Sequence, residues 1–385
     1  MRIGIDARTL SYEHTGIPIF VHDVLQYWSE YKKDDEYYLY SNRDLNVDFE
    51  LGDNWHIVID KHRFGGIWVQ TRLRRLLKRD KIEAFWEPMN FLPARIKGVS
   101  YYVTVHDLAV YLFPKFGAVT DSILERLLLK KSCKRADKII AISESTKRDI
   151  ATHLGIQDEK IEVIYNGDSP YKNKAVSYSE DTGKEILSKW NLIKREYLLF
   201  VGTIEPRKNV GTIVAAYEQL RDTSEYTGKL VIAGKQGWKC TKIIEAIENN
   251  KYRDDIVVTG YISEAEKECL YRNAQCLVFP SLYEGFGFPI LEAMSVGLPV
   301  VTSNVSSMPE VGLDAAFYVE ESDLHNEEII AKVIHDALNI SDEERIKLRD
   351  KMNRIVNSHS RLDSAESIYQ LIAGKGQEYG KNINC

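Results

Sequence analysis

The sequence has 385 residues, of which 44% are hydrophobic and 28% are charged, and its formal net charge is −6. A chain of this length and composition is long enough for two ordinary domains and is not intrinsically disordered. Because it has no overall basic excess, the composition argues against a nucleic-acid-binding protein. No run of about 18 apolar residues predicts a membrane-spanning helix.

The cysteines and the first residues bear on the compartment. The five cysteines are widely spaced, and none belongs to a Cys-x-x-Cys pair. This spacing favours reduced thiols in a cytoplasmic protein. The first ten residues, MRIGIDARTL, resemble a buried strand and not a charged segment followed by an apolar one, so we expect no secretory signal.

The first half alternates buried strands with helices. Strands are expected at 2–7, 36–41, 55–59, 84–86, 101–105, 138–142 and 161–165. A glycine loop that contains Gly16 follows the first strand, and a helix is expected from about Ile19 to Ser29. The sequence around this loop lacks Gly-x-Gly-x-x-Gly, so no dinucleotide fingerprint is predicted. Gly16 either brings the backbone close to a phosphate or simply makes the turn, and the sequence does not decide between these.

Two predicted helices of the first half are strongly basic. Residues 68–81 carry six Lys or Arg residues beside an apolar stripe, and residues 119–135 end in LLLKKSCKR. Such helices suit an anionic membrane surface. An ordinary solvated face is the alternative.

His106 follows the strand that ends at Val105. The end of a parallel strand lies at the sheet edge where ligands bind. His106 is therefore a candidate for contact with a sugar hydroxyl or with the acceptor. A structural histidine held by Asp107 is the alternative.

The second half repeats the alternation after a polar stretch. We place the linker at residues 168–184, which contain Pro170 and Gly183. Strands are expected at 197–201, 229–233, 256–259, 300–303 and 316–319, and helices at 325–338, 342–357 and 361–373. Both halves thus predict an α/β fold of two Rossmann-like domains with parallel sheets, facing across a cleft.

Two cations follow the first strand of the second half. In GTIEPRKN, Arg207 and Lys208 stand between a strand and a helix. A guanidinium fork and an ammonium at a helix N-terminus suit a diphosphate. Ion pairing with Glu205 at a solvated surface is the alternative. The loop after the strand at 256–259 contains Tyr261, which is a candidate for contact with a nucleobase.

The stretch FPSLYEGFGFPILEAMSVGLPVVT carries the strongest signal. It predicts a strand end, a loop with Gly285, Phe286 and Gly287, a short helix with Pro289 in its first turn, and a second strand. Glu284 lies in the loop, and Glu292 is expected in the first turn of the helix. Backbone N–H groups at the helix start suit an anion, while the two carboxylates suit hydroxyls. A phosphorylated sugar fits both requirements, whereas the alternative is a surface loop in which Glu292 only favours the helix dipole.

These motifs resemble a known family. EGFGFPILEAM is similar to the Glu-x7-Glu signature of the family-4 retaining glycosyltransferases, GTIEPRKN to their diphosphate motif, and RIGIDARTL, TGIP and VHD to their acceptor domain. The resemblance implies a GT-B fold with an acceptor domain at 1–175 and a nucleotide-sugar domain at 185–360. It also implies a C-terminal helix, in 361–385, that crosses back to the first domain, although its SRLDSAESI start lacks the aromatic residues frequent in the family.

The resemblance also implies roles for individual residues. Arg207 and Lys208 would bind the donor diphosphate, Glu292 the ribose hydroxyls and Glu284 the transferred sugar. His106 would lie near the reacting centre and Gly16 beside the phosphate. The sequence contains no Asp-x-Asp, so we expect neither a metal nor a cofactor, with the nucleotide sugar acting as substrate.

The expected reaction is retaining hexosyl transfer to a saccharide or polyprenyl-linked saccharide in cell-surface polysaccharide synthesis. The motifs are most similar to those of bacterial mannosyltransferases of O-antigen or capsule assembly, which use GDP-mannose. A UDP-sugar donor stays open. A sugar-nucleotide epimerase and a non-catalytic transferase subunit are rival classes, and a cytoplasmic enzyme at the inner face of the plasma membrane is the expected location.

Overall fold

The computed structural model describes residues 1–11, 16–113, 119–167, 171 and 176–374. The chain forms two compact units. The first comprises Met1–Leu112, Ala118–Gly167 and His359–Cys385, and the second comprises Phe113–Gly117 and Asp168–Ser358. Among the described residues, no helix has the length and apolar character needed to cross a bilayer.

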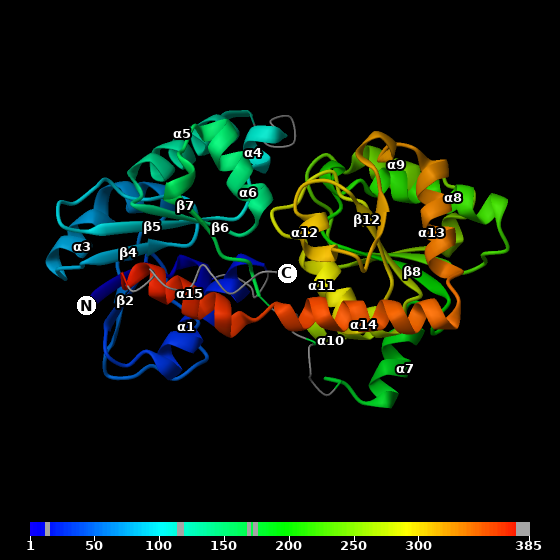
Figure 1. Ribbon diagram of the computed structural model, residues 1–385, viewed down its shortest axis with the longest axis horizontal. Helices are drawn as coiled ribbons and strands as arrows, with labels where there is room; N and C mark the ends of the chain where they lie inside the picture. The colour runs from blue at the N-terminus through cyan, green and yellow to red at the C-terminus, as the bar shows by residue number, and fades with distance from the viewer. Residues whose placement is uncertain (12–15, 114–118, 168–170, 172–175, 375–385) are drawn as a thin grey trace. The chain divides into compact units, whose positions relative to one another are not determined.

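The first unit is built on a parallel sheet of seven strands in the order β3-β2-β1-β4-β5-β6-β7 (Figure 1). The strands are β1 (Arg2–Asp6), β2 (Glu36–Ser41), β3 (Trp55–Ile59), β4 (Ala84–Glu87), β5 (Ser100–Val105), β6 (Lys138–Ala141) and β7 (Ile161–Val163). The strand order reverses between β1 and β4, and ligands bind at the carboxyl ends of strands at such a point in open α/β sheets.

Helices cover both faces of this sheet. One face carries η1 (Arg8–Ser11), α1 (Ile17–Tyr31) and α15 (Arg361–Ile372), and their apolar side chains share a core with Ile3 and Ile5. The other face is covered by a continuous helical run, α2 (Gly65–Trp68), η2 (Val69–Leu73) and α3 (Arg74–Arg79), and by α5 (Val119–Arg135). The remaining helical segments are α4 (Ala109–Leu112), α6 (Glu144–Asp149), η4 (Ile150–Leu154) and η5 (Asp158–Lys160).

The C-terminal helix α15 packs against α1 within the first unit. The indole Nε1 of Trp28 donates to the carbonyl of Ala365 at 2.9 Å, and the hydroxyl of Tyr27 donates to Glu366 at 2.9 Å. Ile368 and Ile372 are buried in the same core. Tryptophan, tyrosine and aliphatic contacts along the helix therefore anchor α15, without aromatic residues at its start.

The second unit has a six-stranded parallel sheet in the order β10-β9-β8-β11-β12-β13. The strands are β8 (Tyr197–Val201), β9 (Lys229–Ala233), β10 (Ile256–Gly260), β11 (Cys276–Phe279), β12 (Val300–Ser303) and β13 (Phe317–Val319). Here the order reverses between β8 and β11. The two sheets confirm the predicted fold class.

The helical segments of the second unit include four α-helices that the sequence reading missed. They are α7 (Glu180–Lys189), α9 (Thr241–Glu248), α10 (Glu264–Asn273) and α12 (Met308–Gly312). The others are η6 (Pro206–Lys208), α8 (Val210–Thr223), η7 (Arg253–Asp255), α11 (Phe288–Ser295), η8 (Glu321–Asp323), α13 (Glu327–Leu338) and α14 (Asp342–Ser358).

The linker prediction is wrong in its second part. Residues 168–170 and 172–175 of the expected linker lie outside the described residues, Pro170 among them. Glu180 begins α7, because the Ser179 hydroxyl caps the helix by accepting from the Thr182 N–H at 3.1 Å. Gly183 is buried inside this helix and is not part of a loop.

Candidate functional site

The strongest candidate site lies at the carboxyl ends of β8 and β11, where the strand order of the second sheet reverses. The loop after β8 carries Arg207 and Lys208, and the loop after β11 carries Glu284. The two loops are joined directly, because the Leu282 N–H donates to the Arg207 carbonyl at 2.9 Å. This is the expected position for a ligand in an open parallel sheet.

A short helical turn presents the two cations. Pro206 opens η6, and Asn209 closes it in the left-handed conformation at φ 59°. The Asn209 amide is fixed by a 2.6 Å bond to the Leu324 carbonyl and accepts from the Thr212 hydroxyl at 2.7 Å. An asparagine tolerates this conformation better than most residues. The turn is thus held rigidly beside the start of α8.

Arg207, Lys208 and Glu284 form one ion cluster. Lys208 Nζ donates to Glu284 Oε1 at 2.5 Å, and Arg207 Nη1 donates to Glu284 Oε2 at 3.2 Å. Arg207 also donates to the Tyr283 carbonyl and to Glu205, each at 2.8 Å. The structure therefore brings together three of the predicted site residues. It also contains the ion pair between Arg207 and Glu205, which was the alternative interpretation of this motif.

The charge state of Glu284 follows from this cluster. The residue is only 8% exposed, and burial by itself would raise the pKa of its carboxyl. The nearby charges of Lys208 and Arg207 outweigh burial and hold the pKa of Glu284 below its usual range. Glu284 is therefore a carboxylate at neutral pH. It is suited to accept hydrogen bonds and not to donate a proton.

Two serines that follow β12, Ser306 and Ser307, hold the Glu284 loop. The Ser306 hydroxyl donates to the Glu284 carbonyl at 2.5 Å, and Ser307 Oγ donates to the carbonyls of Glu284 and Phe286 at 3.0 and 2.8 Å. Ser307 directly precedes α12, which begins at Met308. The Ser-Ser-Met-Pro run is a sequence signal for this helix, because Pro309 suits the first turn of a helix.

The glycine loop directs the chain into α11. Gly287 adopts φ 104° directly before the helix, a conformation that a residue with a side chain rarely takes. Phe286 is buried and its ring lies 5.1 Å from that of Phe288. Phe286 therefore contributes packing and backbone to the site. Gly285, between Glu284 and Phe286, completes the loop.

The expectation that Glu292 lies in the first turn of the helix is wrong. Glu292 is the fifth residue of α11, it is 8% exposed, and it faces α10. Its Oε2 accepts from the Tyr271 hydroxyl at 2.8 Å, and its Oε1 accepts from Lys267 Nζ at 3.0 Å. Burial would lower the pKa of Lys267, but Glu292 and Glu264 raise it, so the ammonium stays charged. Glu292 is thus a fixed acceptor and not a helix-dipole residue.

The sequence alone does not predict Lys267 and Tyr271 as site residues, although it contains a signal for their helix. Both lie on α10, which Ser263 and Glu266 start with a reciprocal capping box. The S-E-A-E run at 263–266 matches this pattern, and Lys267 and Tyr271 are four residues apart on one face of the helix.

Tyr261 lies in the loop after β10 and is 61% exposed. Lys235 Nζ, from the loop after β9, stands 5.4 Å from its ring centroid. The ring is therefore accessible for stacking, which the predicted contact with a nucleobase requires.

His106 and Gly16 belong to the first unit. His106 Nε2 donates to the Pro88 carbonyl at 2.8 Å, and the ring lies edge-on to Phe20. Burial lowers the pKa of His106, so the ring is neutral. The Pro88 carbonyl is the hydrogen-bond partner of this histidine. The Asp107 carboxylate accepts from the Ala109 N–H at the start of α4 and acts on His106 through its charge. Gly16 is exposed at φ 50° and directly precedes α1.

Two family models match the chain. One, described as Glycosyltransferase Family 4, matches residues 14–168, and the other, described as Glycosyl transferases group 1, matches residues 184–356. The chain belongs to the family-4 glycosyltransferases of the GT-B fold. The motifs around Arg207 and Glu284 lie in the group 1 domain of this glycosyltransferase, and His106 lies in the family-4 domain.

Two relatives of this glycosyltransferase are O-antigen mannosyltransferases of bacteria. An O-antigen chain mannosyltransferase B of Escherichia coli is 30% identical over 237 residues, which are 62% of this chain and 61% of the relative. The O-antigen chain mannosyltransferase RfbU of Salmonella typhimurium is 28% identical over 221 residues, 57% of each chain. The chain thus spans about three fifths of the length of these relatives.

The fold is shared with solved structures. WaaG, described as a glycosyltransferase involved in lipopolysaccharide biosynthesis, superposes with a TM-score of 0.70 at 16% identity, over 97% of this chain and all of WaaG.

Proposed function

We propose that this glycosyltransferase moves a hexose from a nucleotide sugar to a saccharide acceptor with retention of configuration. The observation that carries the proposal is the cluster of Arg207, Lys208 and Glu284 at the switch point of the second sheet. Two cations suit a diphosphate, and an ionised carboxylate beside them suits the hydroxyls of the attached sugar.

The proposed chemistry follows from the charge states. The bond between C1 of the sugar and the diphosphate breaks, and a bond from the acceptor oxygen to C1 forms on the same face. The proton of the acceptor hydroxyl passes to the departing diphosphate, whose developing charge Arg207 and Lys208 stabilise. A retaining hydrolase would instead place two carboxyl groups about 5 Å apart across the bond, one of them as nucleophile.

Glu284 and Glu292 are proposed to grip the donor at two points. The lowered pKa of Glu284 and the engagement of both Glu292 oxygens by Tyr271 and Lys267 argue against an acid–base pair. We assign Glu284 to the transferred sugar, with Gly285, Phe286 and Gly287 supplying backbone beside it. Glu292 is assigned to the ribose and Tyr261 to the nucleobase.

A metal is not required in this scheme. Arg207 and Lys208 would compensate the charge of the leaving diphosphate, which in other transferases a divalent cation does. In the first domain, His106 is proposed to contact the acceptor as a neutral acceptor of hydrogen bonds, since its Nε2–H is used by Pro88. Gly16 is proposed to lie beside the donor phosphate.

The proposed donor is GDP-mannose, and support comes from the two O-antigen mannosyltransferases among the relatives. A UDP-sugar is the alternative. The proposed acceptor is a saccharide or polyprenyl-linked saccharide of cell-surface polysaccharide synthesis, presented at the inner face of the plasma membrane.

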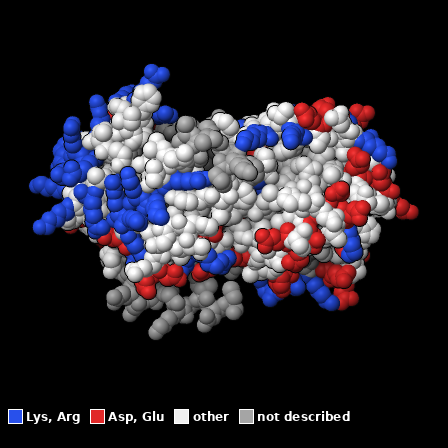
Figure 2. All heavy atoms as spheres, turned by 90° about the horizontal axis from the view of Figure 1, so that it is seen from above, with Lys and Arg blue, Asp and Glu red and all other residues white. Residues whose placement is uncertain are grey.

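The first unit offers a surface suited to such a membrane. Figure 2 shows Lys and Arg side chains gathered on the side of the first unit where Figure 1 draws α5. On α5 the apolar residues Ile123, Leu124 and Leu127 are exposed, and Lys131 and Lys134 continue the same side of the helix. Exposed apolar side chains beside cations suit an anionic bilayer. We expect salt-sensitive binding to phosphatidylglycerol vesicles, and no binding at low salt would contradict this part of the proposal.

The transfer reaction tests the proposal as a whole. Purified protein is incubated with GDP-mannose or UDP-sugars, with and without a lipid-linked saccharide fraction, and free nucleotide and new sugar nucleotides are measured. Nucleotide release that depends on acceptor supports the proposal. Interconversion of the sugar without acceptor would show an epimerase, and neither product would indicate a non-catalytic subunit.

A further inference from the structure

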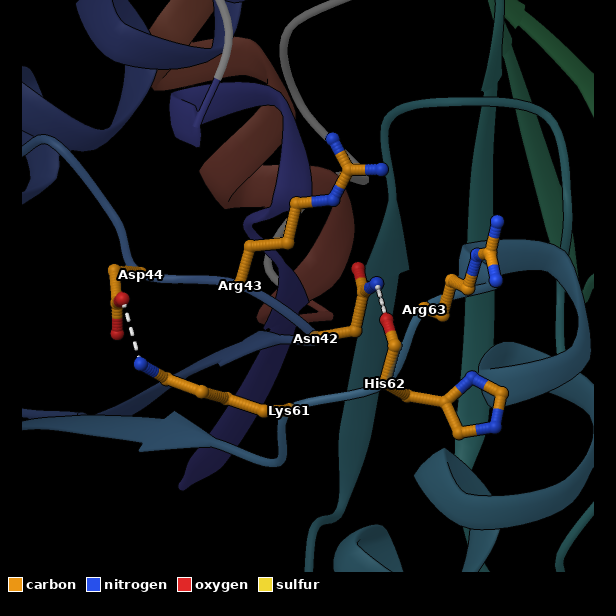
Figure 3. Close-up of a pocket in the computed structure, with 6 residues that line it drawn as sticks. All are labelled: Asn42, Arg43, Asp44, Lys61, His62 and Arg63. Atoms are coloured by element: carbon orange, nitrogen blue, oxygen red, sulfur yellow. Dashed lines mark hydrogen bonds and ion pairs between the residues drawn. The ribbon is translucent and has the colours of Figure 1, made fainter.

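A polar pocket opens at the carboxyl ends of β2 and β3 in the first unit (Figure 3). Its cavity has a volume of about 440 Å³. Six residues line it, namely Asn42, Arg43, Asp44, Lys61, His62 and Arg63. The volume is in the range of small-molecule sites, and the place is the sheet edge at which α/β domains bind ligands.

The frame of the pocket is fixed by hydrogen bonds between the two strand exits. The His62 N–H donates to the Asn42 carbonyl at 3.1 Å, and the buried Asn42 amide donates to the His62 carbonyl at 2.6 Å. Asp60, which directly precedes Lys61, is also fixed, because it accepts from the Trp68 indole at 3.0 Å and from Arg72 at 2.8 Å. The pocket is therefore built on sheet and helix, while its charged side chains remain exposed.

The lining attracts anions. Among the six lining residues, Arg43, Lys61 and Arg63 are cationic, and Asp44 is acidic. Asp44 accepts from Lys61 at 2.7 Å, but both side chains are more than two thirds exposed, so this pair is weak. In Figure 3 the guanidinium groups of Arg43 and Arg63 project on the same side of the Asn42–His62 bond. Two guanidinium forks suit a phosphate or a diphosphate.

Directly after the pocket residues, the chain exposes two large apolar side chains. Phe64 is 56% exposed and Ile67 is 53% exposed, at the start of the helical run that begins with Gly65. A phosphate site bordered by apolar side chains is suited to an amphiphile. We propose that this pocket binds the phosphate groups of a lipid-linked acceptor, with Arg43 and Arg63 on the phosphate and Phe64 and Ile67 on the lipid chain.

This inference rests on the proposed function, in that it names the acceptor as an apolar chain carrying a phosphate or diphosphate. A single bilayer lipid presents similar chemistry. The pocket is assigned to the acceptor because it lies at the ligand edge of the sheet and has the volume of a small-molecule site.

Calorimetric binding of three soluble probes, farnesyl diphosphate, inorganic diphosphate and farnesol, tests the site in the full chain. Farnesyl diphosphate is expected to bind at least ten times more tightly than either of the other two. The double variant R43A/R63A should lose at least tenfold in affinity for farnesyl diphosphate. F64S/I67S should lose the advantage of farnesyl diphosphate over diphosphate and keep the affinity for diphosphate itself.

A charge-matched control removes two exposed lysines elsewhere, K97A/K194A, and should leave all three affinities unchanged. Equal loss in the control and in R43A/R63A would overturn the proposal, as would unchanged affinity in R43A/R63A. Equal affinity for diphosphate and farnesyl diphosphate would reduce the pocket to a free anion site. Binding to phosphatidylglycerol vesicles without binding of farnesyl diphosphate would assign it to the bilayer.

A second readout separates this inference from the proposed function. GDP and UDP should raise the melting temperature of R43A/R63A as much as that of the unchanged protein, because Arg43 and Arg63 are not among the residues proposed to bind the donor. If neither nucleotide stabilises the unchanged protein, the proposed function fails while the amphiphile measurement still decides the pocket.

Discussion

Replacing Glu284 with glutamine should separate the stability of the second domain from its activity. In the unchanged protein the Glu284 carboxylate receives charged hydrogen bonds from Lys208 and Arg207 in a buried setting. Glutamine keeps the shape and one acceptor oxygen but removes the negative charge. One of the two cations then keeps a neutral acceptor in place of an ionic one, and the other faces the amide NH2 group and loses its hydrogen bond.

The loss can be bounded from these contacts. A hydrogen bond to a charged partner is worth about 1.5–3 kcal/mol, against about 0.5–1.5 kcal/mol for a neutral one. One weakened bond and one lost bond predict a loss of about 2.5–4.5 kcal/mol in the free energy of unfolding at pH 7. For a domain of this size, the melting temperature should fall by about 5–18 °C. Glu205→Gln is the matched control, because the Glu205 carboxylate pairs with Arg207. This variant weakens one hydrogen bond, so its loss should be about 1–1.5 kcal/mol.

The pH dependence of this loss is the diagnostic part. Since the folded pKa of Glu284 lies below its unfolded value, its contribution to stability is complete above the unfolded pKa, about 4.3, and disappears as the pH falls through the folded pKa. Chemical denaturation from pH 7 to pH 3 should therefore show the curves of E284Q and the unchanged protein converging at low pH. Nucleotide diphosphates should still bind, while sugar transfer should fall by about 100-fold or more. A constant gap across this range, or full transfer by E284Q, would refute the reasoning.

Other changes test further parts of the account. Lys208→Ala should reduce turnover by about 100-fold or more with an unchanged circular dichroism spectrum, and unchanged turnover would reject Lys208 as a diphosphate ligand. Tyr271→Phe removes one hydrogen bond from Glu292 and should weaken nucleotide binding by about 3- to 10-fold. A deoxyribose nucleotide should show no such difference, and an equal loss for both nucleotides would deny the link to the ribose. Burial first, and then the charge of Asp6, raise the pKa of the Glu87 carboxyl well above its usual range. The unchanged protein should therefore lose stability relative to Glu87→Gln as the pH rises above about 4.3, a trend that parallel pH–stability curves would exclude. Ile368→Ala should lower the free energy of unfolding of the first unit by about 2–5 kcal/mol, measurable by urea denaturation, because Ile368 anchors α15 in its core.

The sheets and their loops were predictable because their signals are local. β8, β9 and the strands around Glu284 appear as apolar runs bounded by glycine or proline, and the motif glycines mark where each loop must turn. Because Arg207 and Lys208 follow a strand, the sequence alone predicts that they lie at the edge of the sheet where ligands bind. Their joint pairing with Glu284 was not predictable, because the two loops are more than 70 residues apart in the sequence.

The errors come from tertiary contacts and from short helices. The predicted position of Glu292 in the first turn is wrong because α11 begins at Phe288, which makes Glu292 its fifth residue. Its real partners lie on α10, a helix with the low apolar content that hides it from a periodicity search. Likewise, His106 is held by the carbonyl of Pro88, and no pattern of side chains announces a backbone partner. The pocket that we propose for an anion arises from the ends of β2 and β3, which strand pairing brings together.

The most direct test of the central claim is the thermal stability of the protein with GDP, UDP, dTDP and GMP, measured for the unchanged chain and for Lys208→Ala. At about 100 times its Kd, a bound nucleotide stabilises a protein by about 2.7 kcal/mol. The account predicts that at least one diphosphate raises the melting temperature of the unchanged protein, that GMP does so less, and that the shift largely disappears in Lys208→Ala. No shift with any diphosphate, or the same shift in Lys208→Ala, would contradict the assignment of Arg207, Lys208 and Glu284 to a nucleotide-sugar site.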